Sequence, residues 1–166
     1  MPKTLMCDPK LFEKDLSGRT YIVTGANSGS GFATSEQLIK QGAHVVGACR
    51  RVSAGEEIFA DLKNEKGSYE IMALDLASLD SVRKFAEAFK AKYNKLDGLV
   101  NNAGINIRKP IEEMRAEELD MMYQVNIKGP FLGIKHVLPL MKNSGGGTII
   151  NMSSVCGLNG HKYTPE

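Results

Sequence analysis

The first residues that could do chemistry form a glycine-rich segment early in the sequence. Residues 24–31 read Thr-Gly-Ala-Asn-Ser-Gly-Ser-Gly, after a short apolar run and before a segment of helical period. Glycine permits a tight turn and a close approach of the backbone to a ligand. The free amides that open the next helix, together with the helix dipole, favour a bound anion. The segment therefore predicts a turn that holds the pyrophosphate of a dinucleotide; a purely structural turn is the alternative.

Two arginines follow the second apolar run, in the sequence Cys49-Arg50-Arg51. An NAD-binding protein usually offers a carboxylate to the adenosine ribose at this place, and here that acid is missing. A guanidinium pairs well with a phosphate and poorly with a neutral diol. Arg50, helped by Arg51, therefore favours NADP over NAD as the cofactor, unless the two arginines are merely solvated at a strand end.

The elements that must position these residues alternate along the chain. Short runs rich in β-branched residues alternate with longer segments of helical period, which is typical of βαβ units and a parallel sheet. We expect five strands, over residues 21–23, 44–48, 69–74, 98–100 and 148–151. The prediction is an α/β fold with three layers. Residues 1–18 are expected to form an extension on the surface, and residues 19–166 one dinucleotide-binding domain.

Apolar spacing predicts the helices between the strands. One helix begins in the glycine-rich turn and continues through Ile39. Ser53 and Glu56 predict a capping box that starts a short second helix. A third helix carries one apolar stripe, made of Val82, Phe85, Ala86, Phe89 and Tyr93. The last is expected over residues 125–141, kinked or ended locally by its prolines.

The composition limits the kinds of partner. The 166 residues include 21 basic and 19 acidic side chains, and a net charge of +2 is too small for an electrostatic footprint on nucleic acid or anionic lipid. No apolar run approaches the roughly 20 residues that cross a bilayer, and residues 1–10 lack a secretory pattern, so we expect a cytoplasmic protein. Cys7, Cys49 and Cys156 are expected to be reduced thiols, and no metal site is expected.

Four motifs occur in order along the chain: Thr24-Gly-x-x-x-Gly-x-Gly31, Asn101-Asn102-Ala103-Gly104, Asn126 followed by Gly129, and Ser153-Ser154-x-x-Gly157. Together they resemble the motifs of the short-chain dehydrogenase/reductase family, over about residues 19–166. The resemblance implies a Rossmann-type fold and an NADP-dependent oxidoreductase that transfers a hydride between the nicotinamide and a small-molecule alcohol or ketone. A non-catalytic dinucleotide-binding module, or an inactive fragment, is the alternative.

The resemblance also implies roles for particular residues. It would place the pyrophosphate on Thr24, Gly25, Asn27, Ser28, Gly29, Ser30 and Gly31, the 2′-phosphate on Arg50 and Arg51, the adenine beside Asp75 and Leu76, and the ribose over Asn102, Ala103 and Gly104. Ser30 departs from the family, which usually has an apolar residue at that position. Asp75 could instead cap the next helix, and residues 102–104 could simply stabilise the central strands.

Ser154 and Asn126 match the family's catalytic serine and asparagine. The Ser154 hydroxyl would bond the substrate oxygen, and Asn126 would hold a kinked helix and a water of the proton relay; a hydroxyl that caps its own turn is the alternative for Ser154. The family's tyrosine follows the serine by about thirteen positions, with a lysine four further on. The sequence ends at Glu166 before both, and Tyr163 lies too close to Ser154 to replace the tyrosine. We therefore expect a fragment of a longer enzyme, with a sheet incomplete at its C-terminal side, that forms a homo-oligomer when complete.

Overall fold

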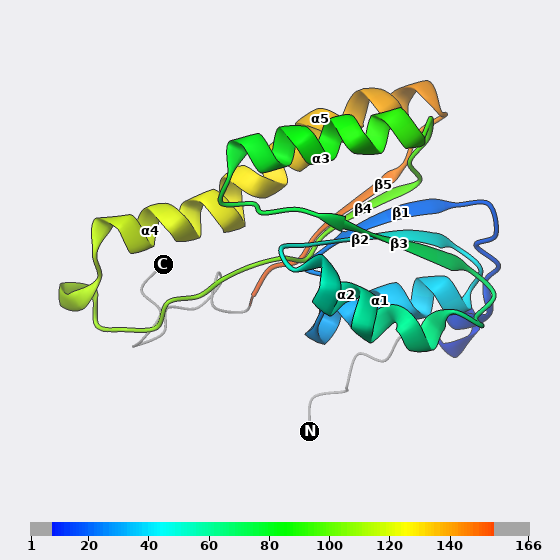
Figure 1. Cartoon of the computed structure of the whole chain (residues 1–166), viewed down its shortest axis with the longest axis horizontal. Coiled ribbons are helices and arrows are strands. Elements are labelled where there is room, and N and C mark those ends of the chain that lie inside the picture. The colour runs from blue at the N-terminus through cyan, green and yellow to red at the C-terminus, as the bar shows by residue number, and fades with distance from the viewer. Residues whose placement is uncertain (1–7, 155–166) are drawn as a thin grey trace.

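The chain folds into three layers around one parallel sheet (Figure 1), as described for residues 8–154 in a computed structural model. The strands are β1 (Thr20–Thr24), β2 (His44–Cys49), β3 (Ser68–Ala73), β4 (Gly98–Asn101) and β5 (Thr148–Asn151), and their spatial order is β3-β2-β1-β4-β5. Each strand pair in the sheet is parallel. The α/β prediction and the five expected strands are confirmed, and the predicted strand ends differ from the observed ones by at most one residue.

Helices cover both faces of the sheet. α1 (Gly29–Lys40) and α2 (Val52–Phe59) lie on one face, and α3 (Leu79–Lys92) and α5 (Gly129–Asn143) lie on the other. α4 (Ala116–Tyr123) extends past the end of the sheet at the left of Figure 1. Short 3₁₀ turns occupy Pro9–Glu13, Ala60–Leu62 and Ile111–Glu113, and a π-helical segment, Gln124–Lys128, joins α4 to α5.

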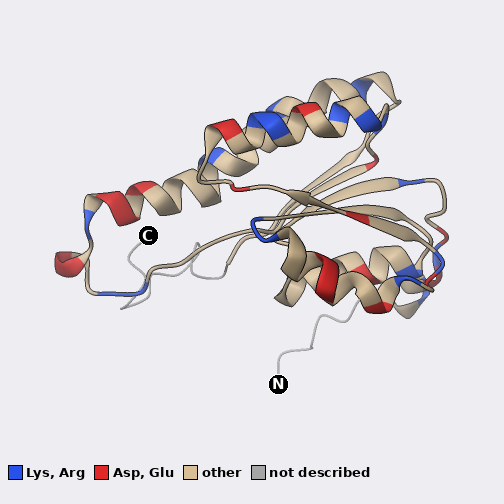
Figure 2. Cartoon of the chain, viewed as in Figure 1, with Lys and Arg blue, Asp and Glu red and all other residues tan. Residues whose placement is uncertain are grey.

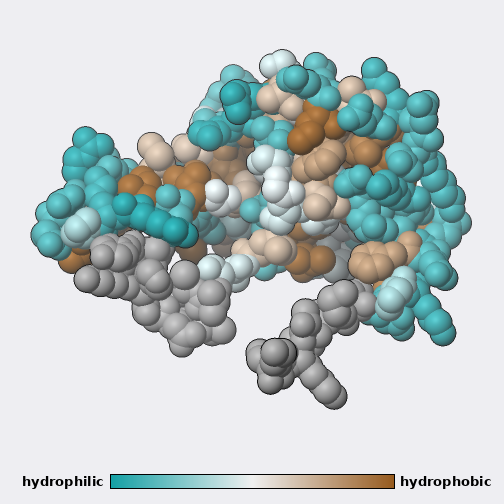
Figure 3. Space-filling model, turned by 90° about the horizontal axis from the view of Figure 1, so that it is seen from below, coloured by the Kyte–Doolittle hydropathy of each residue, from teal (hydrophilic) through white to brown (hydrophobic). Residues whose placement is uncertain are grey.

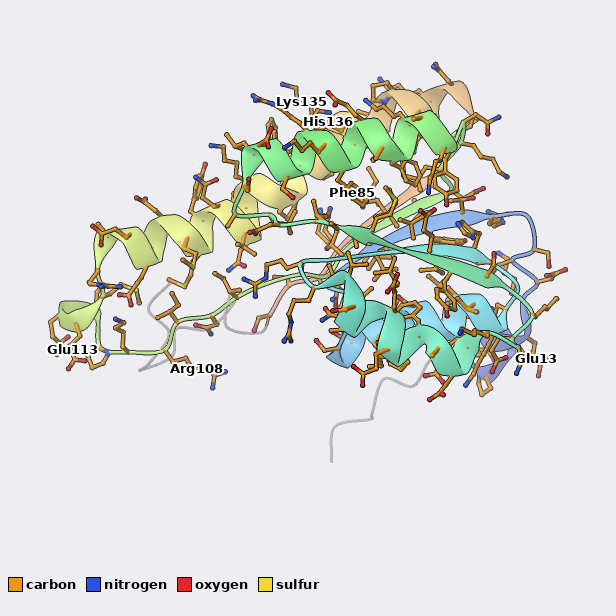
Figure 4. The ribbon with its side chains drawn as sticks, viewed as in Figure 1. Glu13, Phe85, Arg108, Glu113, Lys135 and His136 are labelled. Carbon is orange, nitrogen blue, oxygen red and sulfur yellow. The ribbon has the colours of Figure 1, made fainter. Side chains whose placement is uncertain are left out.

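Adjacent residues of β1 belong to two different hydrophobic cores. Ile22 belongs to the cluster that contains Phe85 of α3, and Val23 belongs to the cluster that contains Ile39 of α1 and Phe59 of α2. Successive side chains of a strand point to opposite faces of the sheet, so a strand covered on both faces is apolar throughout. Phe85 extends from α3 toward the sheet (Figure 4), which explains the apolar stripe predicted for this helix.

The predicted capping box at Ser53 and Glu56 is wrong. α2 begins at Val52, Arg51 is its N-cap residue, and Ser53 lies inside the first turn. The backbone N–H of Gly55 donates to the Arg51 carbonyl at 3.2 Å and closes the first turn. The helix therefore begins two residues before the start that Ser53 would give as its N-cap residue. The start of the helix follows from where the chain leaves β2, and no side-chain cap is needed there.

The helix predicted over residues 125–141 has a different extent. A continuous helical segment begins at Ala116, widens to a π turn over Gln124–Lys128 and continues as α5 past Pro139 to Asn143. Pro130 sits in the first turn of α5, where its missing N–H is tolerated. The Gly129 N–H donates to the Gln124 carbonyl, five residues back, so the hydrogen-bond register changes just before this proline. The proline changes the helix without ending it.

The segment before β1 lies against the carboxyl end of α1. The side-chain amide of Gln41 donates to the carbonyls of Leu11 and Lys14, both at 2.9 Å, and Leu16 is buried. The boundary at residue 18 stays a prediction. Cys49 is a buried free thiol, whereas Cys7 and Cys156 lie outside the described residues.

Within residues 8–154, no helix is long and apolar enough to cross a membrane. The same residues contain no group of three or more histidine, cysteine, aspartate or glutamate side chains that could hold a metal ion. The cytoplasmic location stays a prediction.

A hydrogen-bonded histidine at the amino ends of β2 and β3 leads to a prediction about pH. His44 Nδ1 lies 2.8 Å from Ser68 Oγ, and its Nε2 lies 2.8 Å from the Tyr93 hydroxyl, which donates to Glu70 at 2.6 Å. Burial lowers the pKa of His44 below its usual value of 6.5, although Glu70 opposes the shift. The unfolded chain therefore binds a proton at His44 more readily than the folded chain does. The free energy of unfolding should decrease as the pH falls below about 6.5.

The variant His44→Gln should lose part of this decrease in the free energy of unfolding below about pH 6.5, as measured by urea denaturation at a series of pH values. Burial also lowers the pKa of His136, so His136→Gln should remove a further part. The pKa of Glu70 is lowered by Lys92 and Tyr93 against the effect of burial, so Glu70 changes the free energy of unfolding only below about pH 4.5. If the free energy of unfolding depends on pH in both variants as it does in the parent chain, the assignment of this pH dependence to His44 and His136 is wrong.

Candidate functional site

The predicted site residues meet where the strand order reverses. β2 and β3 lie to one side of β1, and β4 and β5 lie to the other, so β1 and β4 are neighbours although they are far apart in the sequence. Ligands of open α/β sheets bind outside the carboxyl ends of the strands at such a point. The glycine-rich turn follows β1 there, and residues 102–104 follow β4.

A cleft of about 420 Å³ opens at this point, between the strand ends and α4. Most of the predicted cofactor residues line it: Thr24, Gly25, Asn27, Ser28, Arg50, Asp75, Leu76, Asn102, Ala103 and Gly104. Gly29, Ser30 and Gly31 form the adjoining first turn of α1, and Arg51 is the N-cap residue of α2. These four, together with Asn126 and Ser154, are not part of the cleft lining.

Sequence reasoning missed several residues of the lining, namely Ala48, Cys49, Leu74, Ala77, Ile105, Met121 and Val125. Most of them directly precede or follow residues that the motifs had identified, so the same strand ends could have indicated them. Met121 and Val125 come from α4 and the π-helical segment, and no local pattern places that helix over the sheet edge. Burial raises the pKa of the Cys49 thiol, whose Sγ donates to the Arg51 carbonyl at 3.2 Å.

Two glycines give the turn its shape. Gly25 has a φ of +66°, and a Cβ there would lie 3.0 Å from the Cα of Ala103. At Gly31 a Cβ would lie 2.3 Å from the Gly25 carbonyl oxygen and 2.5 Å from Asn102 Nδ2. Only glycine lets the first turn of α1 pack directly on the turn that precedes it.

The first amides of α1 have no capping side chain. Ser28 is the N-cap residue in an extended conformation, and its side chain makes no capping hydrogen bond. The first turn closes with the Phe32 N–H, which donates to the Ser28 carbonyl at 3.2 Å. The amides of Gly29, Ser30 and Gly31 precede that bond and have no acceptor within the helix. Together with the cleft beside them, they fit a bound diphosphate, which supplies oxygens for such amides.

Thr24 joins the ends of the two central strands. Its Oγ1 accepts hydrogen bonds from the backbone N–H groups of Asn102 and Ala103, both at 3.0 Å. The side chain of Asn102 donates from Nδ2 to the Thr24 carbonyl, also at 3.0 Å. Asn102 therefore stabilises the central strands, which is the alternative role given above for residues 102–104. It also lines the cleft.

Asp75 does not cap α3, so that alternative is wrong. The cap residue is Ser78, whose hydroxyl accepts from the Ser81 N–H at 3.3 Å. Asp75 Oδ1 instead accepts from the Ala77 N–H at 3.0 Å, which holds the carboxylate at the cleft wall next to the buried Leu76. Arg50 is exposed and lines the same cleft from the end of β2.

Asn126 connects the π-helical segment to the chain that leaves β4. Its Oδ1 accepts from the Ile105 N–H at 2.9 Å, and its Nδ2 donates to the Ile105 carbonyl at 2.8 Å. Both polar ends of the side chain are therefore used for the backbone of one residue. Ser154 is exposed and is the last described residue after β5; Gly157 and Tyr163 lie outside the described residues. The catalytic roles of Asn126 and Ser154 stay predictions.

Comparison with known proteins agrees with this geometry. A model of the short-chain dehydrogenase family matches residues 19–165. The chain is 45% identical to Dehydrogenase/reductase SDR family member 13 of Bos taurus, over 84% of this chain and 36% of that protein. It is 34% identical to the D-threitol dehydrogenase of Mycolicibacterium smegmatis, over 86% of this chain and 55% of that protein. The chain therefore spans between about a third and just over half of the length of these relatives.

Solved structures are similar as well. A metagenomic short-chain oxidoreductase in complex with NADP superposes with a TM-score of 0.86 at 34% identity, over 90% of this chain and 68% of that one. The L-sorbose reductase of Gluconobacter frateurii, complexed with NADPH and L-sorbose, has a TM-score of 0.87 at 29% identity, over 92% of this chain and 59% of that one.

Proposed function

Since the chain belongs to the short-chain dehydrogenase family, we propose that it carries the cofactor-binding part of an NADP-dependent oxidoreductase that acts on a small-molecule alcohol or ketone. The observation that carries this proposal is the row of uncapped amides at Gly29, Ser30 and Gly31 beside a cleft of about 420 Å³. A diphosphate placed there would accept hydrogen bonds from these amides, for which the helix itself supplies no acceptor.

Arg50 supports NADP in preference to NAD. Arg50 is exposed and lines the cleft directly after the carboxyl end of β2. A guanidinium pairs with a phosphate in a bidentate geometry and gains little from a neutral ribose diol. Two structural relatives were solved with NADP or NADPH, and at 34% and 29% identity this supports the same preference here.

The remaining roles follow the same arrangement. Asp75 and Leu76 would hold the adenine, and Asn102, Ala103 and Gly104 would support the ribose that carries the nicotinamide. Bound NADPH would supply the hydride. We assign Ser154 to a hydrogen bond with the substrate oxygen, and Asn126 to holding the helix against Ile105, where its side-chain bonds support this role.

Titration with NADPH tests the proposal, with cofactor fluorescence as the signal because the chain contains no tryptophan. We expect saturable binding, and tighter binding of NADPH than of NADH. Failure to bind either nucleotide would contradict the proposal. A hydride-transfer assay on the whole protein, with alcohols and ketones, then separates an oxidoreductase from a module that binds the dinucleotide without chemistry.

We also propose that the whole protein is a homo-oligomer and that α4 and α5 contact a second copy. Four exposed apolar residues recur at every fourth position: Leu119, Tyr123, Ile127 and Phe131, which are 54–62% exposed. Figure 3 shows apolar side chains gathered over the part of the molecule that contains α4. α4 is acidic (Figure 2), and Lys135 on the outer side of α5 is basic (Figure 4), so two copies packed antiparallel would pair opposite charges.

The variant Phe131→Glu should lower the association constant of this oligomer at least tenfold, because it places a charge in an apolar contact. Light scattering over a range of protein concentrations measures the effect. Phe12→Glu is the matched control, since Phe12 is also about half exposed but lies in the 3₁₀ turn before β1. Equal masses for all three proteins at every concentration would contradict the proposed contact.

A further inference from the structure

Ser30 lies in the first turn of α1, yet its hydroxyl is bonded to a different part of the chain. Ser30 Oγ donates to Asn102 Oδ1 at 2.8 Å, across 72 positions of sequence. Ser30 is not among the residues that line the cleft, although its neighbours Asn27 and Ser28 are. A hydroxyl carries a single proton, and here that proton is used for the Asn102 side chain.

The Asn102 amide continues this bond to the end of β1. Its Nδ2 donates to the Thr24 carbonyl at 3.0 Å, while its backbone N–H donates to Thr24 Oγ1. The two ends of the amide thus face a donor and an acceptor, which fixes its orientation. We call the bonds from Ser30 through Asn102 to Thr24 the Ser30 bridge. It joins the first turn of α1 to the ends of both central strands.

We infer that the side chain of Ser30 is a positioning group for cofactor binding: its hydroxyl acts through the Ser30 bridge and does not touch the cofactor, whereas its backbone amide belongs to the row that binds the diphosphate; this inference rests on the proposed function. The amides of Gly29, Ser30 and Gly31 can bind one anion together only if the turn that carries them is held in place. A turn that is already ordered spends less binding free energy on ordering when the ligand arrives. Gly31 brings α1 close enough for the bridge to form, because its missing Cβ leaves room for Asn102 Nδ2.

The variant Ser30→Ala should weaken NADPH and NADH binding by the same factor, about two- to tenfold, the effect of one hydrogen bond. The factors should be equal because both nucleotides carry the diphosphate. Ser30→Thr keeps the hydroxyl and should stay within about twofold of the parent chain. Ser53→Ala is the matched control, since Ser53 occupies the same second position in α2, and it should have no effect.

The variant Asn102→Ala distinguishes two roles of the Ser30 hydroxyl: a bond to Asn102 that positions the turn, and a direct contact with the cofactor. In that background Ser30→Ala should cause no further loss of affinity, because the acceptor of its hydroxyl is already gone. If the loss is as large in the Asn102→Ala background as in the parent chain, or if Ser30→Ala leaves both dissociation constants unchanged, the inference is wrong.

Hydrogen exchange tests the same inference without any nucleotide. The Phe32 N–H closes the first turn of α1, so its exchange in the free chain should be about two- to tenfold faster in Ser30→Ala and unchanged in Ser53→Ala. Unchanged exchange at Phe32 would overturn the inference. If the parent chain binds no NADPH while this exchange still changes, the proposed function fails and the bridge stands.

Discussion

Replacing Gly31 by alanine should weaken NADPH binding by at least about 100-fold, which corresponds to about 2.7 kcal/mol. The added Cβ would lie 2.3 Å from the Gly25 carbonyl oxygen, closer than any real contact, and 2.5 Å from Asn102 Nδ2. Gly25 contributes backbone atoms to this contact, so no side-chain rotation relieves it, and α1 must move away from the turn. The same movement displaces the amides that would bind the diphosphate and breaks the Ser30 bridge.

Fluorescence titration measures the loss, and Gly133→Ala is its matched control. Gly133 lies inside α5, where a Cβ would be 3.4 Å from Asn101 Oδ1 and 3.7 Å from Leu99, which are ordinary contacts. That variant should bind NADPH normally and be as stable as the parent or slightly more so, because alanine favours helix over glycine. If Gly31→Ala keeps the parent's affinity, the diphosphate does not lie on this turn.

Replacing Arg50 by alanine should weaken NADPH binding by about 10- to 100-fold and leave NADH binding nearly unchanged. The range follows from the 1.5–3 kcal/mol typical of a hydrogen bond to a charged group, reduced somewhat because Arg50 is exposed. Arg50 lines the cleft, and the 2′-phosphate that we propose it binds is the one group that distinguishes NADP from NAD. The preference for NADPH should therefore disappear.

Arg51→Ala provides the comparison, because Arg51 has the same charge but is not part of the cleft lining. We expect less than a threefold change in that variant. The difference in NADPH affinity between Arg50→Ala and Arg51→Ala should also become smaller at high salt, since ions screen an exposed charge pair. Equal losses of NADPH and NADH affinity in Arg50→Ala would contradict the 2′-phosphate assignment, and a larger loss in Arg51→Ala would move it to the neighbouring residue.

Elements whose pattern is local could be predicted from the sequence. The five strands were predicted to within one residue because a strand covered on both faces must be apolar along its length. The apolar stripe of α3 was equally clear, since Val82, Phe85, Ala86 and Phe89 are all buried. The start of α2 and the whole of α4 were not predicted. α2 begins where the chain leaves β2, and α4 buries only Met122 among its residues, so it shows little helical periodicity of burial.

The sequence by itself determined the strands, the glycine-rich turn and most of the cleft residues, because each of these depends on residue types that are neighbours along the chain. Only the tertiary structure decided which groups those residues bond. The hydroxyl of Ser30 could equally have pointed to a ligand, and the amide of Asn126 could have pointed into the cleft. Folding brings Asn102 and Ile105 beside them. A hydrogen bond between residues far apart in the sequence depends on distances that exist only after the strands have paired, and no spacing along the chain encodes them.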